Sequence, residues 1–270
     1  MHEATWPPRA RVDLAQAPIL VGLAAVAVVG WLVTDERMAG MDMGPGTDLG
    51  SLGFYVSIWV VMMAAMMLPS TAPMVAVHSA VERRARELGR PTTRGTSVAF
   101  VAGYLLVWTV FGVLAYAGFE LIRSLDVDAL SWDRAGRYVA AGVIAVAAAY
   151  QLTPLKNQCL AKCRSPLAFV VGSWRGGWTG ATRMGVEHGA WCVGCCWALM
   201  ATLFALGVMS LTWTVVVAAL VAVEKVVPWK HANLAVALVL ILLALGVAIA
   251  PEDVPGLTVP DQSMTSMMER

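Results

Sequence analysis

Charged residues are scarce in this sequence. Of its 270 residues, 14% are charged and 59% are hydrophobic, and the mean hydropathy is +0.69. A soluble domain is typically about a quarter charged, so this composition excludes an ordinary water-soluble protein. The net charge of only +1 provides no basic face for a nucleic acid. We therefore predict an all-α polytopic membrane protein, a single transmembrane helical domain over residues 1–270 whose main partner is the lipid bilayer.

The motifs of several enzyme classes are also missing. The sequence contains no Gly-rich phosphate loop and no nucleotide-binding motif, so we expect none of the enzyme activities that depend on them. It contains no Cys-x-x-Cys-His motif for haem attachment and has only four histidines. A haem or Fe–S protein is therefore the weakest of the alternatives, and enzymatic activity in general is not predicted.

Apolar runs long enough to cross a bilayer occur repeatedly, since a span needs about 20 mostly apolar residues. The first run resembles a signal peptide, but it is long for one and no clean cleavage site follows, so we take it as a retained span. A shorter apolar piece at 167–174 is predicted to be re-entrant or interfacial. The second span is expected to continue as a helix past Pro69 toward His78. The seven predicted spans are 15–33, 52–68, 96–122, 136–152, 186–208, 211–227 and 234–250.

Lysine and arginine are unevenly distributed among the predicted connections. If the N-terminus is cytoplasmic, 14 of the 19 Lys and Arg residues lie on the cytoplasmic side, in agreement with the positive-inside rule. This predicts a multi-pass protein of the bacterial inner membrane with its N-terminus inside and its C-terminus outside. The connection 153–185 is then a cytoplasmic, Cys-containing loop. The Met-rich loop 35–51 and the Met-containing tail 251–270 are then exterior.

One stretch combines a histidine with three of the five cysteines. On a helix, His188, Cys192, Cys195 and Cys196 fall at positions i, i+4, i+7 and i+8, which share one face. Met200 extends the same face. Thiol and imidazole groups in this arrangement suit a soft or borderline ion, copper as Cu(I) or, alternatively, zinc.

The other two cysteines form a second pair on the same predicted side of the membrane. Cys159 and Cys163 are four residues apart, which places them on one face if the segment is helical. Cytoplasmic thiols stay reduced, so no structural disulfide is expected. Buried cysteine is also a common small apolar residue, but all five cysteines and a histidine on one side favour a metal or thiol-redox role.

Methionines provide a second pattern of soft ligands. Met63, Met67, Met74 and His78 have spacings compatible with one stripe of the second span, and thioether sulfur favours Cu(I). Methionine is also ordinary core filler, yet it has no packing reason to cluster in a polar, Gly-rich exterior loop. The candidate thioether ligands are Met62, Met63, Met66 and Met67 in the span and Met38, Met41 and Met43 in the loop, with Met264, Met267 and Met268 in the tail.

Three charged residues lie near these ligands. Glu224 and Lys225 end the predicted sixth span, and ionisable residues at membrane depth are functional candidates. A bland interfacial pair remains an equal alternative, because Lys225 can extend to the interface. Glu187 precedes His188 and can orient its imidazole, act as a ligand, or be a solvated acid in the first turn of its helix.

Several of these motifs together resemble one bacterial family. They are Met-Met-Ala-Ala-Met-Met-Leu-Pro-Ser at 62–70, the Cys159/Cys163 pair followed by Pro166, the block from Gly185 to Met200 with His-Gly-x-x-Cys-x-Gly-Cys-Cys-Trp, and Glu224-Lys225. The family consists of uncharacterised multi-pass proteins described as predicted metal-binding integral membrane proteins. The resemblance implies a metal site, copper in the first place, and no established reaction.

Two functional hypotheses remain. In the first, the protein binds a soft metal ion and transfers or transports it, with a metallochaperone or a metalloenzyme as partner. In the second, the cysteines exchange disulfides or carry electrons, because Cys192-x-x-Cys195 has the spacing of a thiol-redox centre. The exterior methionines are explained only by the first hypothesis.

Overall fold

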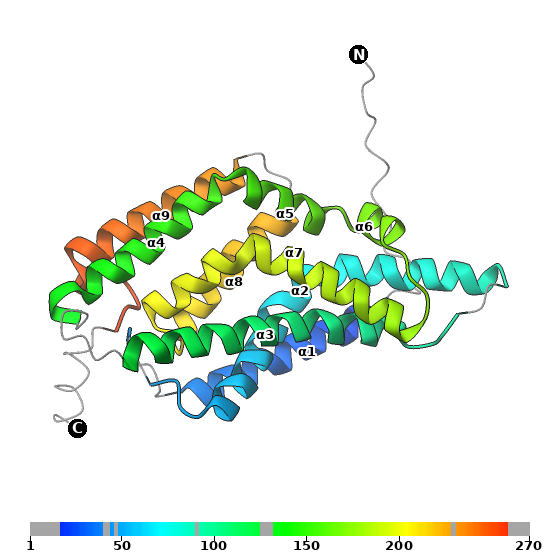
Figure 1. The fold of residues 1–270 in the computed structure, drawn as a ribbon, viewed down its shortest axis with the longest axis horizontal. Coiled ribbons are helices and arrows are strands. Elements are labelled where there is room, and N and C mark those ends of the chain that lie inside the picture. The colour runs from blue at the N-terminus through cyan, green and yellow to red at the C-terminus, as the bar shows by residue number, and fades with distance from the viewer. Residues whose placement is uncertain are drawn as a thin grey trace, which may run out of the picture.

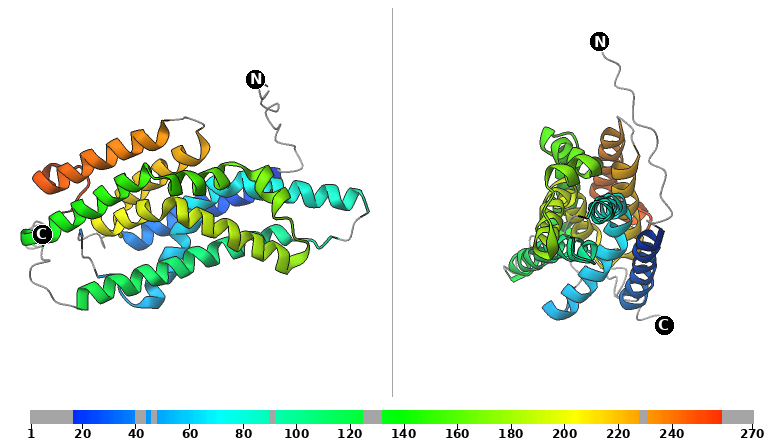
Figure 2. Two further views of the ribbon diagram at one scale, coloured as in Figure 1. Left: turned by 45° about the horizontal axis from the view of Figure 1, so that its top comes forward. Right: turned by 90° about the vertical axis from the view of Figure 1, so that its right-hand side faces the viewer.

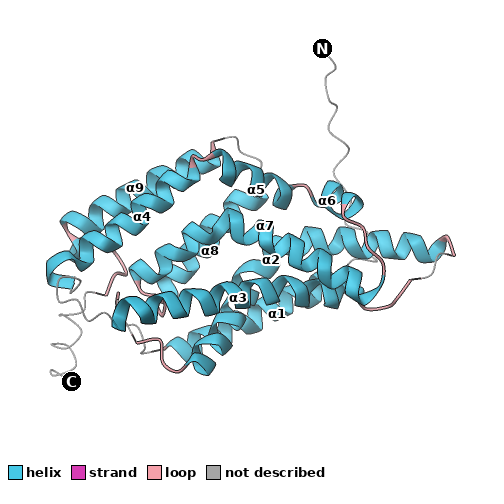
Figure 3. Cartoon of the chain, in the orientation of Figure 1, coloured by secondary structure: helices cyan, strands magenta, loops and turns pink. Residues whose placement is uncertain are grey.

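The computed structural model describes residues 17–39, 44–45, 48–89, 92–124, 132–227 and 231–258, and every regular element within these ranges is helical (Figure 3). This confirms the predicted all-α class. Most helices run along the long axis of the molecule (Figure 1). They are α1 (Ala17–Met38), α2 (Leu52–Glu87), α3 (Thr96–Ser124), the π-helical η3 (Trp132–Gly136), α4 (Arg137–Gln151), α5 (Pro154–Arg164), α6 (Pro166–Gly172), α7 (Gly177–Leu206), α8 (Leu211–Val226), α9 (Ala232–Ile249) and the 3-10 turn η4 (Pro251–Asp253).

Among the described residues, five helices are long and apolar enough to cross a bilayer, namely α1, α2, α3, α7 and α9. α4 and α5 pass this test only as a pair, which is bent by 67° at its break. The candidate spans therefore number five or six, fewer than the seven predicted. The remaining predicted span corresponds to α8, whose 16 residues extend over about 24 Å at 1.5 Å per residue, short of the ~30 Å hydrocarbon core.

α2 continues through Pro69 and Pro73 to Glu87, as expected for the stretch beyond Pro69. A proline inside a helix removes a backbone hydrogen bond, and in membrane helices neighbouring groups compensate for this loss. Ser70 Oγ donates a hydrogen bond to the Met67 carbonyl at 2.8 Å. The methionines of the predicted stripe and His78 consequently lie buried on one unbroken helix.

α3 and α7 form the closest helix pair at the centre of the bundle. A Cβ atom at Gly103 would overlap the carbonyl oxygen of Thr182, and one at Gly185 would overlap that of Phe100. Small residues at such crossings let membrane helices approach backbone to backbone. Around this pair, α1 packs against α2, and α4 packs against α9 (Figure 2).

α7 begins earlier than the sequence indicated. It starts at Gly177, whereas the predicted span began at 186. The stretch 153–185 therefore comprises α5, the seven-residue α6 and the first turns of α7, with only 173–176 connecting the last two. As a result, Cys192 lies near the middle of a 30-residue helix, whereas the predicted span 186–208 placed it within the first two turns.

Candidate metal centre

Three sulfur atoms form a tight group near the middle of α7. The Sγ atoms of Cys192, Cys195 and Cys196 all lie within 4.8 Å of one another, and those of Cys195 and Cys196 are 3.2 Å apart. The three residues occupy positions i, i+3 and i+4, which meet on one helix face. Each is at most 1% exposed, so the sulfurs lie inside the protein.

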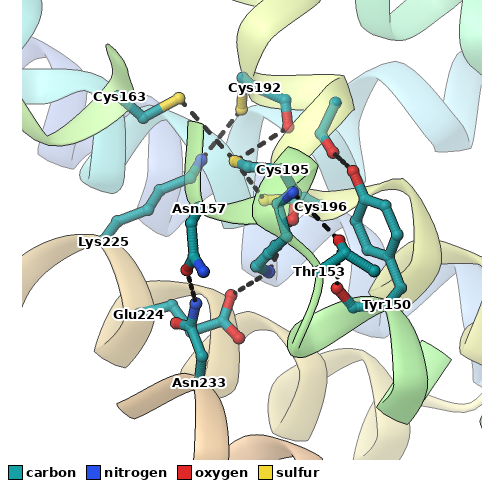
Figure 4. Close-up of polar contacts among 12 residues, drawn as sticks. Tyr150, Thr153, Asn157, Cys163, Cys192, Cys195, Cys196, Glu224, Lys225 and Asn233 are labelled. Carbon is teal, nitrogen blue, oxygen red and sulfur yellow. Dashed lines mark hydrogen bonds and ion pairs between the residues drawn. The ribbon is translucent and has the colours of Figure 1, made fainter. Parts of the chain in front are cut away.

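A fourth thiol reaches this group from α5. The Sγ atom of Cys163 lies 3.8 Å from that of Cys195, and Figure 4 shows the four side chains converging. Cys163 is only partly buried, unlike the three cysteines on α7, and all five cysteines are free thiols. We refer to Cys163, Cys192, Cys195 and Cys196 as the thiol cluster.

α5 starts at a capped first turn and is held against α7 and α8 by the buried side chain of Lys156. Thr153 Oγ1 accepts a hydrogen bond from the Lys156 backbone N–H at 3.2 Å, and Pro154 occupies the first turn, where proline is favourable. Lys156 Nζ donates to the Cys195 carbonyl at 2.6 Å and pairs with Glu224 Oε2 at 2.6 Å. These contacts set the position of Cys163 at the other end of α5.

Cys159 does not belong to the tight sulfur group. A Cβ atom at Gly194 would lie 2.9 Å from Cys159 Sγ, so glycine is what allows α5 to approach α7 here. The Tyr150 hydroxyl donates to the Gly194 carbonyl at 2.5 Å. The two cysteines expected on one face thus have different surroundings, because Cys159 packs against the α7 backbone and Cys163 joins the cluster.

Glu224 and Lys225 contact the site through different partners. Glu224 pairs with Lys156, and its backbone carbonyl accepts a hydrogen bond from Arg164 Nε at 2.6 Å. Lys225 Nζ lies 2.9 Å from Cys192 Sγ. The ammonium of Lys225 therefore contacts a sulfur on α7 directly.

Tyr104 and Lys156 are site residues that sequence reasoning missed. The Tyr104 hydroxyl, on α3, lies 3.0 Å from Cys192 Sγ. No motif or spacing in the sequence distinguishes this tyrosine from its neighbours in the long apolar run of the span. Lys156 was counted only as a loop charge, although Thr153-Pro154 is a helix-start signal that places it in a first turn.

His188 lies one helical turn before Cys192, as predicted, but outside the tight sulfur group. Its ring stacks on that of Tyr104 with centroids 5.6 Å apart, and it is 3% exposed. Within the described part of the chain, its Nδ1 atom has no hydrogen-bond partner. The two carboxylate oxygens of Glu187 contact Ser173 and Arg175, each at 3.2 Å.

The methionines of α2 lie beside this region. Met67 Sδ is 3.9 Å from Lys225 Nζ, so a thioether and the Cys192 thiol both approach the same ammonium. Met62 Sδ lies 3.9 Å from Thr214 Oγ1 of α8. The four predicted thioether ligands Met62, Met63, Met66 and Met67 are all buried.

The other candidate ligands lie further along the same helices or outside the described residues. Met200 is buried one turn beyond Cys196. His78 contacts Ser97 at 3.4 Å, a packing environment that does not include the cluster. Met38 is the last residue of α1 and is 3% exposed, so it belongs to a helix and not to the predicted loop. Met41, Met43, Met264, Met267 and Met268 lie outside the described residues.

A cavity of about 410 Å³ opens between α5, α6 and α7. Its lining includes Lys162 and Ser165, on either side of Cys163 in sequence, and Trp191, which precedes Cys192. Lys162 Nζ lies 5.9 Å from the centroid of the Trp191 ring. The cavity therefore adjoins the stretch of α5 that carries the only partly buried thiol of the cluster.

Closely spaced thiols inside a helix bundle indicate a metal-binding class of protein. Thiolate sulfur is the ligand type that soft ions such as Cu(I) prefer, with zinc as a borderline case. The fold and the cluster thus describe an integral membrane protein with a candidate soft-metal site. A family model described as "PpoB2: Copper chaperone" matches residues 56–249, from α2 to the end of α9, and the chain belongs to this family. No curated protein and no solved structure matches the chain.

Membership of this family supports the predicted association with copper and with partner proteins. The resemblance was to metal-binding membrane proteins without a specified metal, and the family description specifies copper. The family description names the metal and no ligands.

Proposed function

We propose that this protein binds Cu(I) at the thiol cluster inside the membrane and transfers it to a partner. The supporting observation is the group of three buried sulfurs within 4.8 Å of one another on α7. The three thiolates on α7 can satisfy Cu(I), a soft ion without a demand for four ligands. Copper is the cargo in this proposal, and Cys163 is the ligand nearest the surface.

The methionines of α2 supply the weaker ligands of the proposed path. An ion that must move on needs sites from which it can leave, and neutral thioethers hold Cu(I) less tightly than thiolates do. Met67 is linked to the α7 thiols through Lys225, whose ammonium contacts both Met67 and Cys192. Met41 and Met43 of the predicted exterior loop, with the methionines of the tail 251–270, would collect or release the ion at the other end.

Zinc and thiol-disulfide exchange fit the same residues less well. A structural zinc site takes four tetrahedral ligands, but the tight group supplies only three, because Cys163 and His188 both lie outside it. Disulfide exchange requires a thiolate that a partner can reach, whereas the α7 thiols are at most 1% exposed. A bare metal ion needs far less access than a protein thiol, which favours copper binding over redox exchange.

The path can be separated from the binding site with a volume-conserving double substitution. The wild type, purified with its thiols reduced, should hold about one Cu(I) per chain. Met63→Leu with Met67→Leu keeps volume and apolarity but removes two thioethers. It should retain that copper, and copper movement in membrane vesicles should be about tenfold slower, as expected for about 1.4 kcal/mol of lost stabilisation.

Met209→Leu is the matched control, because Met209 is buried to a similar degree outside the proposed path. It should behave as the wild type in both measurements. Wild-type movement by the double variant would remove the α2 methionines from the path and leave the thiol cluster as the only ligand set. A wild type that holds no copper would refute the proposal itself.

The proposed orientation in the bacterial inner membrane places the N-terminus inside and the C-terminus outside. It is supported by the excess of Lys and Arg on the cytoplasmic side. Seven crossings require that α8 and the α4–α5 pair each cross. A topology reporter fused after residue 270 should read as exterior, and one inserted within 83–94 should read as cytoplasmic. A cytoplasmic C-terminus would contradict this odd number of crossings.

A further inference from the structure

The ammonium group of Lys225 lies inside a set of sulfur and oxygen atoms. Its Nζ atom is 2.9 Å from Cys192 Sγ, 3.3 Å from Ser70 Oγ and 3.9 Å from Met67 Sδ. Cys192 belongs to α7, the other two residues to α2, and Lys225 itself to α8. A positive charge thus lies where three helices meet, and Figure 4 shows the side chain directed toward the sulfurs.

The acidic residue closest in sequence does not account for this placement. Glu224 pairs with Lys156 at 2.6 Å, and both side chains are buried. The contacts of the Lys225 ammonium are instead a thiol, a hydroxyl and a thioether. Thiol and thioether sulfur are unusual partners for an ammonium ion, but they are the preferred ligands of Cu(I).

We infer that Met67, Ser70 and Cys192 form a transient Cu(I) site between the α2 methionines and the thiol cluster, and that Lys225 occupies it when copper is absent. This inference rests on the proposed function, since it concerns the same cargo. With Cys192 as a thiolate in both states, Cu(I) and the ammonium group each contribute one positive charge, so their exchange leaves the charge of the buried site unchanged. Exchange therefore avoids the cost of an uncompensated charge in a low-dielectric interior.

Lys225 is placed so that its side chain can leave the site. It is the penultimate residue of α8 and is partly exposed, and the residues that follow, Val226 and Val227, are exposed. A lysine carries its charge on a flexible four-carbon stem that can extend to an interface. Its return behind a passing ion would repel that ion away from α2 and toward the other three cysteines.

The test isolates the transient site by removing the deeper ligands. In the background Cys195→Ser with Cys196→Ser, Lys225 still occupies the donor set, so we expect little Cu(I) to be retained against a competing chelator. Adding Lys225→Leu removes the ammonium without adding a ligand, and retention should rise at least tenfold, to about one ion per chain. Adding Met67→Leu as well should abolish it again.

The charge dependence distinguishes this role from simple packing. Lys225→Arg in the same background keeps the positive charge and should retain as little copper as Lys225 does. Lys225→Gln is a second neutral variant and should retain copper as the leucine variant does. Thermal unfolding in detergent identifies the variants that remain folded.

Wild-type protein measured in parallel distinguishes failure of the proposed function from failure of the transient site. If the wild type holds no copper, the proposed function fails. If the wild type holds copper but the folded Leu and Gln variants do not, the transient site is refuted while the thiol cluster stands. Copper retention that does not depend on Met67 would also refute the transient site.

Discussion

Replacing Cys192 and Cys196 with serine should remove nearly all bound copper from the purified protein. The double variant retains Cys163 and Cys195, whose sulfurs lie 3.8 Å apart, but loses two of the three tightly grouped thiols on α7. A serine hydroxyl is a hard oxygen ligand that Cu(I) does not favour. Loss of an outer-shell contact alone costs about 10- to 100-fold in metal affinity, so we expect more than about 100-fold here. Copper analysis after gel filtration with a competing chelator measures this.

Cys159→Ser is the matched control for this experiment. Cys159 is 5% exposed and lies on the same helix as Cys163, but its sulfur packs against Gly194. Its substitution should leave the copper content at the wild-type level. Full copper content in the folded Cys192/Cys196 variant would show that the ligands lie elsewhere, whereas equal losses in both variants would indicate a general effect of removing buried thiols.

The grouping of the α7 thiols could be predicted because it depends only on local helix geometry. Residues at i, i+3 and i+4 meet on any regular helix, so the spacing of Cys192, Cys195 and Cys196 was sufficient. Their depth in the membrane could not be predicted in the same way. The Gly-rich stretch 175–180 reads as a loop because glycine has weak helix propensity, yet α7 begins at Gly177.

The spacing of residues in the sequence could not predict the contacts between helices. Lys156 meets Glu224 across 68 positions and Tyr104 meets Cys192 across 88, and one sequence holds no periodicity that links them. The predicted span 136–152 ends where α4 ends, but helix α5 was missed as an element, although Thr153-Pro154 marks its start. The structure has a bent helix pair there, and its second helix carries Cys159 and Cys163 toward α7.

Substituting Glu224 with glutamine should be among the most destabilising single changes in the chain. The Lys156–Glu224 pair is 2.6 Å long, and its side chains are at most 1% exposed. Glutamine keeps the size of the side chain and an oxygen acceptor, so the change isolates the lost negative charge. Leaving one partner of a buried pair uncompensated costs about 3–5 kcal/mol. Thermal unfolding in detergent should show a clearly lowered midpoint, and Cys163 should react faster with a thiol reagent as α5 loosens.

A double substitution decides whether charge is the cause. Adding Lys156→Met to Glu224→Gln removes the uncompensated ammonium and replaces it with an unbranched apolar side chain. Because a neutral pair avoids the desolvation penalty, the double variant should be more stable than Glu224→Gln alone. The hydrogen bond from Lys156 to the Cys195 carbonyl is lost as well, so recovery should be incomplete. If the two substitutions instead destabilise the protein additively, Lys156 and Glu224 act independently, and the ion pair does not hold α5 against α8.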